Sequence, residues 1–119
     1  MWRYYNANPL NNNTADCTVR AISTAQSRTW DEVYIELSDL AQQEGVLFDN
    51  SAFIEKYLDE KYPRECHHYQ TLREFMEEYP IGIYLVTMKG HITCVKDGVL
   101  IDTFDCRDRY IWCAWLVEP

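Results

Sequence analysis

Three kinds of residue that together can cleave an acyl bond follow one another along the chain: a cysteine, a histidine and an aspartate. Cys17 begins a run, residues 17–26, whose apolar spacing predicts a helix. Unpaired backbone N–H groups in the first turn of a helix, together with the helix dipole, favour the thiolate, which is the form of cysteine that attacks a carbonyl carbon. Such a nucleophile also needs an imidazole to accept its proton, and the imidazole needs a third group to orient it.

The residue before the cysteine is an aspartate, Asp16, which is a good N-cap for the predicted helix. A carboxylate next to Cys17 opposes a second negative charge on the thiol. If Asp16 caps the helix and pairs with Arg20, four residues further on, that opposition becomes smaller.

His91 is the best placed of three histidines to accept the thiol proton. His67 and His68 are adjacent in a polar segment, where we expect their side chains to point in different directions. His91 follows a Lys-Gly pair and opens a predicted strand. We therefore expect His91 to be the general base.

The next predicted strand offers two acids, Asp102 and Asp105, as the group that orients the histidine. If the Asp-Gly pair between the strands forms a two-residue turn, Lys96 lies opposite Val99 and Asp102 becomes the diagonal neighbour of His91 on one face of the sheet. Asp105 then falls on the opposite face. We expect Asp102 in this role, whereas a three-residue loop or a bulge would reverse the faces and favour Asp105.

These segments, in this order, resemble the papain-like cysteine peptidases, most closely the small bacterial and phage members of that superfamily. The matching segments are ADCTVRAIS at 15–23, GHITCV at 90–95 and IDTFD at 101–105. The order of elements matches over the whole chain, and the motifs cover about twenty residues. The resemblance implies a papain-like fold with a catalytic triad of cysteine, histidine and acid.

The resemblance also assigns the roles within the site. Cys17 would attack the carbonyl carbon, His91 would carry the proton, and Asp102 would orient His91. In the papain pattern a glutamine several residues before the cysteine stabilises the oxyanion, and here Asn11 stands six residues before Cys17. Rival amides nearby are Asn8, Asn12 and Asn13. Thr18, rather than an aromatic residue, follows the cysteine, which departs from the papain group.

Helical patterns precede strand patterns along the chain. Residues 1–16 read as an ordered lead-in loop, and two capping boxes, Thr29 to Glu32 and Thr71 to Glu74, open two of the helices. Helices are predicted at about 17–26, 30–44, 51–62 and 72–79, and strands at 81–88, 91–96, 99–104 and 110–118. This order predicts an α+β fold in which the helices pack against one face of an antiparallel sheet of about four strands.

Composition sets limits on the domain and its partners. A chain of 119 residues with 47% hydrophobic residues can form one core, so a single domain over 1–119 is expected. The net charge of -8 argues against nucleic acid as a partner. A charged leader and a long apolar run are both missing, so we expect a cytoplasmic protein that makes no contact with a membrane. Glu55 belongs to a group of acids expected to form a solvated surface.

Five cysteines, an odd number in a chain without an export signal, argue against a disulfide framework, and most of them are expected as free thiols. Cys94, Cys106 and Cys113 are expected as small residues of the core. A zinc site built from Cys66, His67 or His68, and Cys106 lacks the paired ligand spacing of such sites, so no metal or other cofactor is expected.

The resulting hypothesis is a small papain-like thiol hydrolase that cleaves a peptide or isopeptide bond in a peptide or protein substrate. Substrate contacts are expected from residues 1–16 and 62–70. Two alternatives stay open: transfer of the acyl group to an amine, as in transglutaminase-like members of the wider fold, or a binding module without catalysis, such as an inhibitor or a phage or host-interaction factor.

Overall fold

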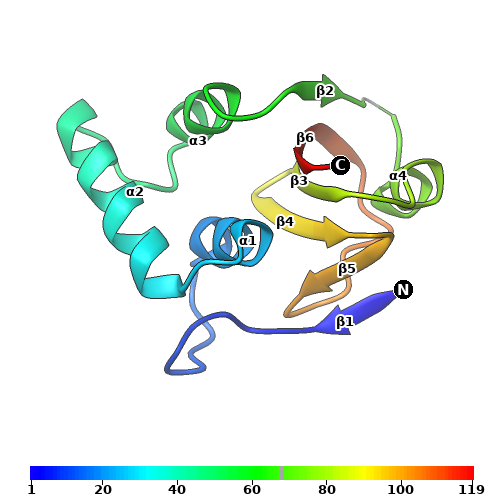
Figure 1. The fold of residues 1–119 in the computed structure, drawn as a ribbon, viewed down its shortest axis with the longest axis horizontal. Coiled ribbons are helices and arrows are strands. Elements are labelled where there is room, and N and C mark those ends of the chain that lie inside the picture. The colour runs from blue at the N-terminus through cyan, green and yellow to red at the C-terminus, as the bar shows by residue number, and fades with distance from the viewer. Residues whose placement is uncertain (68) are drawn as a thin grey trace.

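A computed structural model describes residues 1–67 and 69–119 of the protein as an α+β fold (Figure 1). The helices are α1 (Cys17–Gln26), α2 (Trp30–Glu44), α3 (Ser51–Asp59) and α4 (Leu72–Glu78). The strands are β1 (Trp2–Tyr4), β2 (Arg64–Cys66), β3 (Ile83–Met88), β4 (His91–Lys96), β5 (Val99–Asp102) and β6 (Ile111–Glu118). They form one mixed sheet in the order β1-β5-β4-β3-β6-β2, in which only the β1–β5 pair is parallel within the described residues.

The two predicted capping boxes are confirmed at the starts of α2 and α4. The side-chain oxygens of Thr29 and Thr71 accept hydrogen bonds from the backbone N–H groups of Glu32 and Glu74, and the glutamate side chains return the contact. This reciprocal arrangement satisfies backbone donors that a helix start leaves without partners. Local sequence chemistry therefore fixes where these two helices begin.

The β4–β5 hairpin has the predicted register. Lys96 pairs with Val99, and both residues of the turn between them have positive φ, 48° at Asp97 and 73° at Gly98. Positive φ at both central positions is the backbone of the two-residue turn that matches the twist of antiparallel strands. The face prediction for this hairpin follows from that register.

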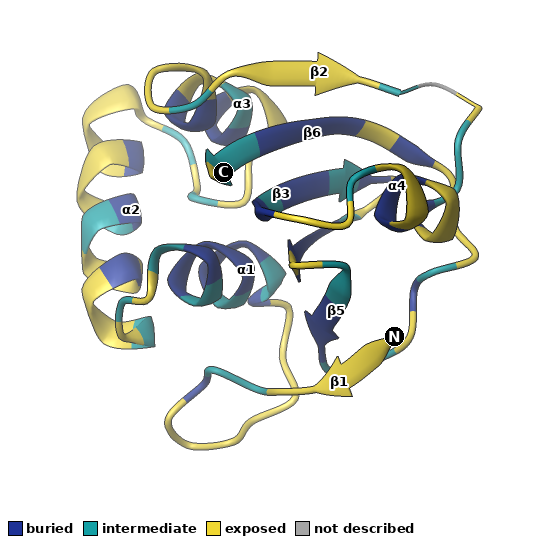
Figure 2. Ribbon diagram, turned by 45° about the vertical axis from the view of Figure 1, so that its right-hand side comes forward, coloured by how far each residue is buried: buried dark blue, intermediate teal, exposed yellow. Residues whose placement is uncertain are grey.

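Two short edge strands extend the sheet from the predicted four strands to six. β1 lies in the segment expected as a lead-in loop and pairs with β5, whereas β2 pairs with β6. All six residues of these strands are exposed, which Figure 2 shows in yellow. Three-residue strands without apolar alternation depend on pairing with distant segments, so no local pattern marks them.

The core lies on both faces of the sheet, which corrects the expectation that every helix packs on one face. α1 packs against one face and α2 packs against α1, and α1, α2 and α3 share a core with Leu85, Cys94 and Trp115 of that face. α4 covers the other face, where Val86 and Val95 are buried. The central strands are apolar on both sides and therefore need a helix on each.

A disulfide joins Cys66 of β2 to Cys113 of β6, which corrects the expectation against disulfides, while the other three cysteines are free, as expected for most of them. They face each other in the β2–β6 register. Cys94 and Cys106 are free and buried, as predicted, and Cys17 is free and partly exposed. Because β2 was not predicted, nothing in the local pattern indicated that Cys66 and Cys113 lie opposite one another. Among the described residues, no helix has the combined length and hydrophobicity that a membrane crossing requires.

Replacing Cys66 and Cys113 together with serine is expected to lower the free energy of unfolding by about 2–4 kcal/mol, because the bridge restricts the unfolded chain. The cross-link closes a loop with a sequence separation of 47. Urea denaturation with and without a reducing agent measures this contribution. The serine variant should show no response to the reductant, and equal unfolding midpoints for the native protein in both conditions would contradict the prediction.

Candidate active site

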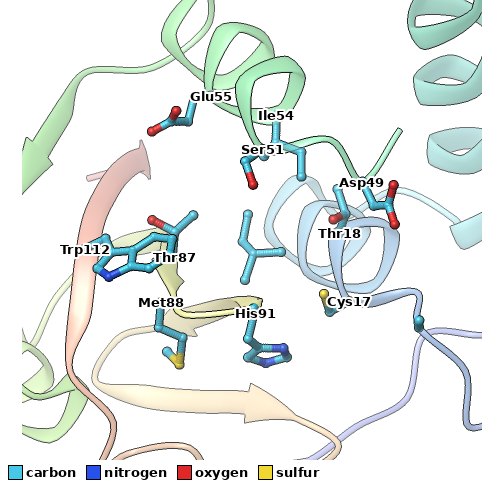
Figure 3. Close-up of a pocket in the computed structure, with 13 residues that line it drawn as sticks. Cys17, Thr18, Asp49, Ser51, Ile54, Glu55, Thr87, Met88, His91 and Trp112 are labelled. Carbon is cyan, nitrogen blue, oxygen red and sulfur yellow. The ribbon is translucent and has the colours of Figure 1, made fainter. Parts of the chain in front are cut away.

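Cys17, His91 and Asp102 come together at the contact between α1 and the β4–β5 hairpin. Nε2 of His91 lies 2.7 Å from Oδ2 of Asp102, and the Cys17 and His91 side chains line the same cleft (Figure 3). Because Nε2 faces the carboxylate, Nδ1 is the nitrogen left for the thiol. Cys17 is the first residue of α1 and His91 the first of β4, so two element starts bring thiol and imidazole together.

Proton affinities in this group favour a thiolate and an imidazolium. Burial opposes ionisation of Cys17, but hydrogen bonds with His91 and the Ile92 backbone, and the positive charges of His91 and Arg20, hold the pKa of the thiol below its usual value. Burial also opposes the charged imidazole, yet hydrogen bonds with Asp102, Cys106 and Cys17 raise the pKa of His91 to about 11. Both pKa shifts are in the direction that favours transfer of the thiol proton to the imidazole.

Asp102 is buried and fully engaged by hydrogen bonds. Oδ2 accepts from the hydroxyl of Thr93 at 2.6 Å in addition to its contact with His91, and Oδ1 accepts from the backbone N–H of Thr103 at 2.6 Å. Burial works against the carboxylate, but the hydrogen bonds from His91 and Thr93 hold the pKa of Asp102 below its usual value. The carboxylate is therefore ionised and fixed in orientation.

Asp105, the alternative acid, lies outside this group. Its exposed carboxylate binds the guanidinium of Arg107 through both oxygens at 2.8 Å. The two-residue turn explains the difference, because it places Asp102 on the face of the hairpin that carries His91.

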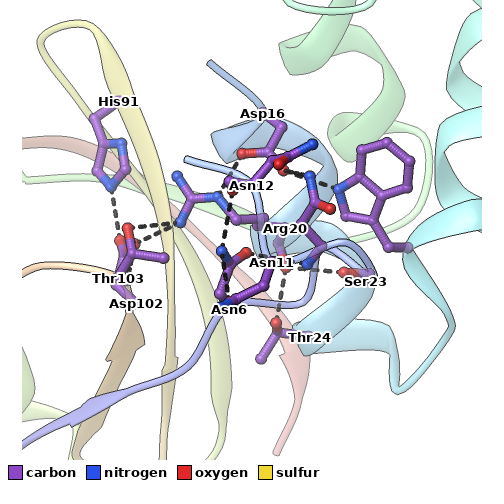
Figure 4. A network of polar contacts seen from close by, with 12 residues as sticks. Asn6, Asn11, Asn12, Asp16, Arg20, Ser23, Thr24, His91, Asp102 and Thr103 are labelled. Carbon is purple, nitrogen blue, oxygen red and sulfur yellow. Dashed lines mark hydrogen bonds and ion pairs between the residues drawn. The ribbon is translucent and has the colours of Figure 1, made fainter. Parts of the chain in front are cut away.

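Arg20 adds a link to this site that sequence reasoning missed. Its Nε donates to Oδ1 of Asp16 at 2.7 Å, which confirms the expected pair, and its Nη1 donates to Oδ1 of Asp102 at 2.9 Å (Figure 4). Asp16 makes no side-chain cap hydrogen bond to α1 and instead also accepts from the indole of Trp30 at 2.9 Å. The sequence separation of 82 between Arg20 and Asp102 leaves no local signal for this contact.

The predicted oxyanion donor, Asn11, belongs to the loop before α1 and, within the part of the chain that the structure describes, does not line the cleft beside Cys17. Its side-chain oxygen accepts from the amide of Asn6 at 3.4 Å. Asn8 donates its amide to Asp16. Because the Asp16 side chain does not cap α1, it does not occupy the backbone N–H groups in the first turn of the helix. These N–H groups, next to Cys17 in sequence, are the candidate donors to an oxyanion.

An open cleft of about 310 Å³ begins at Cys17 and His91 (Figure 3). Its walls include Trp112, which is 47% exposed, and the apolar residues Ile54 and Met88. Asp49 and Glu55 also line it, so Glu55 is not only a solvated surface residue. Of the two segments expected to contact substrate, 1–16 contributes Ala15, and no described residue of 62–70 lines the cleft.

Ligand atoms of His91, Asp102 and Cys106 lie within 4.8 Å of one another, which raises the question of a metal ion. Two ligands of a tetrahedral zinc ion lie roughly 3.3 Å apart or more, given its usual bond lengths, whereas His91 and Asp102 are 2.7 Å apart. The guanidinium of Arg20 on Asp102 also repels a cation. A shared proton fits this group better than a metal. In the zinc alternative considered above, Cys66 is taken by the disulfide, and His68 lies outside the described residues.

Free Cys94 differs from Cys17 in its surroundings. It is completely buried, and burial raises its pKa to about 12. Cys106 is also buried, so of the free thiols only Cys17 combines partial exposure, an imidazole partner and an adjacent cleft.

Comparison of the chain with models of known protein families, with curated proteins and with solved structures finds no match.

Proposed function

We propose that the protein is a cysteine-dependent hydrolase of the papain-like type that cleaves a peptide or isopeptide bond. The observation that supports this most is the placement of Cys17 and His91 at the end of one open cleft, with His91 hydrogen-bonded to Asp102 behind it. A thiol at a helix start, an imidazole with a raised pKa and a fixed carboxylate are the components of nucleophilic acyl transfer. The packing of α1, which carries Cys17, against the hairpin that carries His91 and Asp102 also supports the papain-like comparison.

In the proposed reaction, Sγ of Cys17 attacks the carbonyl carbon, and the carbonyl oxygen becomes an oxyanion that the backbone N–H of Cys17 stabilises. The imidazolium of His91 donates its proton to the leaving amine as the C–N bond breaks, which leaves a thioester on Cys17. His91 then removes a proton from water, the resulting hydroxide attacks the thioester, and the carboxylic acid product and the thiol are released.

A p-nitrophenyl ester of a short N-acyl amino acid tests this proposal without knowledge of the natural substrate. Hydrolysis predicts repeated turnover and an acyl adduct on Cys17 in acid-quenched protein, both of which are absent in Cys17→Ala. A single burst without turnover favours the binding module. An amide product in the presence of a primary amine, formed at the expense of the acid, favours the acyltransferase.

The charges of the cleft predict which reagents reach Cys17 fastest. Asp49 and Glu55 are acids, no lysine or arginine is among the described lining residues, and Arg64 compensates Glu55 at 3.2 Å. A trimethylammonium-ethyl methanethiosulfonate should therefore react with Cys17 faster than the sulfonatoethyl reagent. Asp49→Asn should lower the ratio of these rates about two- to three-fold, the effect of roughly 0.5 kcal/mol of screened surface electrostatics.

Asp39→Asn on α2 is the matched control, because it changes the net charge equally and Asp39 is exposed and absent from the lining. The rates are measured at pH 9, above the usual thiol pKa of ~8.5, so the comparison of the two reagents does not depend on activation of Cys17 by His91. An equal change of the ratio in both variants would show that only net charge matters.

A further inference from the structure

We infer that Arg20 is a positioning residue of the triad: it holds α1, which carries the nucleophile, against the end of β5, which carries Asp102. As a statement about catalysis this inference rests on the proposed function. The contact itself does not, because it is a mostly buried ion pair of 2.9 Å between Nη1 of Arg20 and Oδ1 of Asp102. The side chains of Arg20 and Asp102 are only 12% and 3% exposed.

The helix explains how Arg20 acts on Cys17. The two residues lie three positions apart on α1, which corresponds to about 4.5 Å along the helix axis. Any slide of α1 along the sheet would therefore move the guanidinium and the thiol together. Because the guanidinium is bound to Asp102, and Asp102 binds His91, the same contact sets the approach of the thiol to the imidazole.

The two oxygens of Asp102 have separate partners. Oδ2 accepts from His91 and Thr93, whereas Oδ1 accepts from Arg20 and the Thr103 backbone. Nη1 of Arg20 also donates to the hydroxyl of Thr103 at 3.1 Å. Rotation of the carboxylate would break contacts on both oxygens, so Arg20 helps to hold Oδ2 in the orientation that His91 needs.

Arg20 also removes an electrostatic obstacle beside the nucleophile. Asp16 precedes Cys17 and is only 4% exposed, and an uncompensated carboxylate there would disfavour the thiolate. Nε of Arg20 binds Asp16 at 2.7 Å. With His91 protonated, the charges of Asp16, Arg20, Asp102 and His91 cancel, whereas without Arg20 the site would be negative before the thiol ionises.

Asp16, the second carboxylate that Arg20 binds, is also held by residues outside the site. Oδ2 of Asp16 accepts from the indole of Trp30, which begins α2, and from the amide of Asn8 at 3.3 Å. The engagement of Asp16 with these donors explains why it does not cap α1, so the N–H groups beside Cys17 stay available for an oxyanion. Arg20 thus connects α1 and the hairpin directly, and the lead-in segment and α2 through the Asp16 carboxylate.

Lysine in place of Arg20 tests the simultaneous contact with Asp16 and Asp102 while keeping the positive charge. A single ammonium cannot reproduce the fork that binds two carboxylates. In Arg20→Lys we expect the midpoint of the pH profile of Cys17 alkylation by iodoacetamide to move up by about one unit. The rate at pH 6 should fall about ten-fold.

Arg28→Lys is the matched control, because Arg28 forms a partly exposed pair with Glu36 away from the site. In this variant the rate of Cys17 alkylation at pH 6 should change less than two-fold. Thermal unfolding of each variant checks that the fold is retained. A profile for folded Arg20→Lys that equals that of the native protein would overturn the inference, since charge alone would then suffice.

Proton NMR separates this inference from the proposed function. The His91–Asp102 hydrogen bond should give a strongly downfield imidazole N–H resonance in the native protein and in Arg28→Lys, and this resonance should broaden or disappear in Arg20→Lys. If native Cys17 reacts like an ordinary thiol but the resonance depends on Arg20, hydrolysis is contradicted and the positioning role stands. If the resonance persists unchanged in Arg20→Lys, the positioning role is contradicted whatever Cys17 does.

Discussion

Replacing Asp102 with alanine is expected to lower the free energy of unfolding by about 3–5 kcal/mol, because it removes one partner from a buried charged network. Asp102 is 4% exposed. Its loss leaves the guanidinium of Arg20 with one carboxylate and leaves the imidazole of His91 and the hydroxyl of Thr93 without their acceptor. Urea denaturation followed by circular dichroism measures the change.

Asp105→Ala is the natural control for this prediction, because Asp105 is the other acid of the segment and its carboxylate is exposed. Removing its surface pair with Arg107 should cost less than about 1 kcal/mol. Equal stabilities of the two variants would contradict the buried network. Acid offers a second check: the pKa of Asp102 is lowered in the folded protein, so its stabilising effect is present above the unfolded value near ~3.9 and is lost as the pH falls through the folded value.

Replacing His91 with alanine is expected to reduce ester turnover about 10³-fold, within the range that general acid–base catalysis contributes. The variant retains Cys17 but loses the group that accepts the thiol proton and donates it to the leaving group. Stability should suffer less than in Asp102→Ala, because Asp102 keeps its contacts with Arg20, Thr93 and Thr103. Turnover of the p-nitrophenyl ester, normalised to the folded fraction, measures the effect.

His67→Ala is the matched control for His91. His67 lies beyond β2 and packs edge-on against Phe75 and Tyr79, so its loss should change turnover less than about two-fold once the folded fraction is taken into account. If His91→Ala retained at least a third of native turnover, His91 would not be the general base.

The site is predictable from the sequence where short-range chemistry determines it. The Asp-Gly pair fixes a two-residue turn, the turn fixes the register, and the register places Asp102 beside His91. The start of α1 at Cys17 follows equally from local spacing. The choice between Asp102 and Asp105 therefore needed only hairpin geometry.

Contacts between distant segments account for what the sequence did not reveal. β1 and β2 are exposed three-residue strands that form only by pairing with β5 and β6. The disulfide and the position of α4 on the second face depend on the same sheet. The Asn11 assignment relied on spacing alone, and the loop before α1 directs the Asn11 amide toward Asn6 instead of the cleft.

Arg20 shows why a residue can be noticed and still be misjudged. Its spacing from Asp16 predicts an ordinary pair between successive turns of a helix, which would contribute only a few tenths of a kcal/mol on a surface. The structure buries that pair and adds Asp102 from a strand far along the chain. The sequence contains both partners but not the distance between them.

The most direct test of the central claim is the rate of alkylation of Cys17 by iodoacetamide as a function of pH, resolved by peptide mass spectrometry, in the native protein and in His91→Ala. A thiolate–imidazolium pair predicts that Cys17 reacts well below pH 7, far faster than buried Cys94 and Cys106, and that the variant loses this reactivity at low pH. If Cys17 instead titrates near ~8.5 like a free thiol, with the same profile in both proteins, the pair does not exist and the hydrolase proposal is wrong.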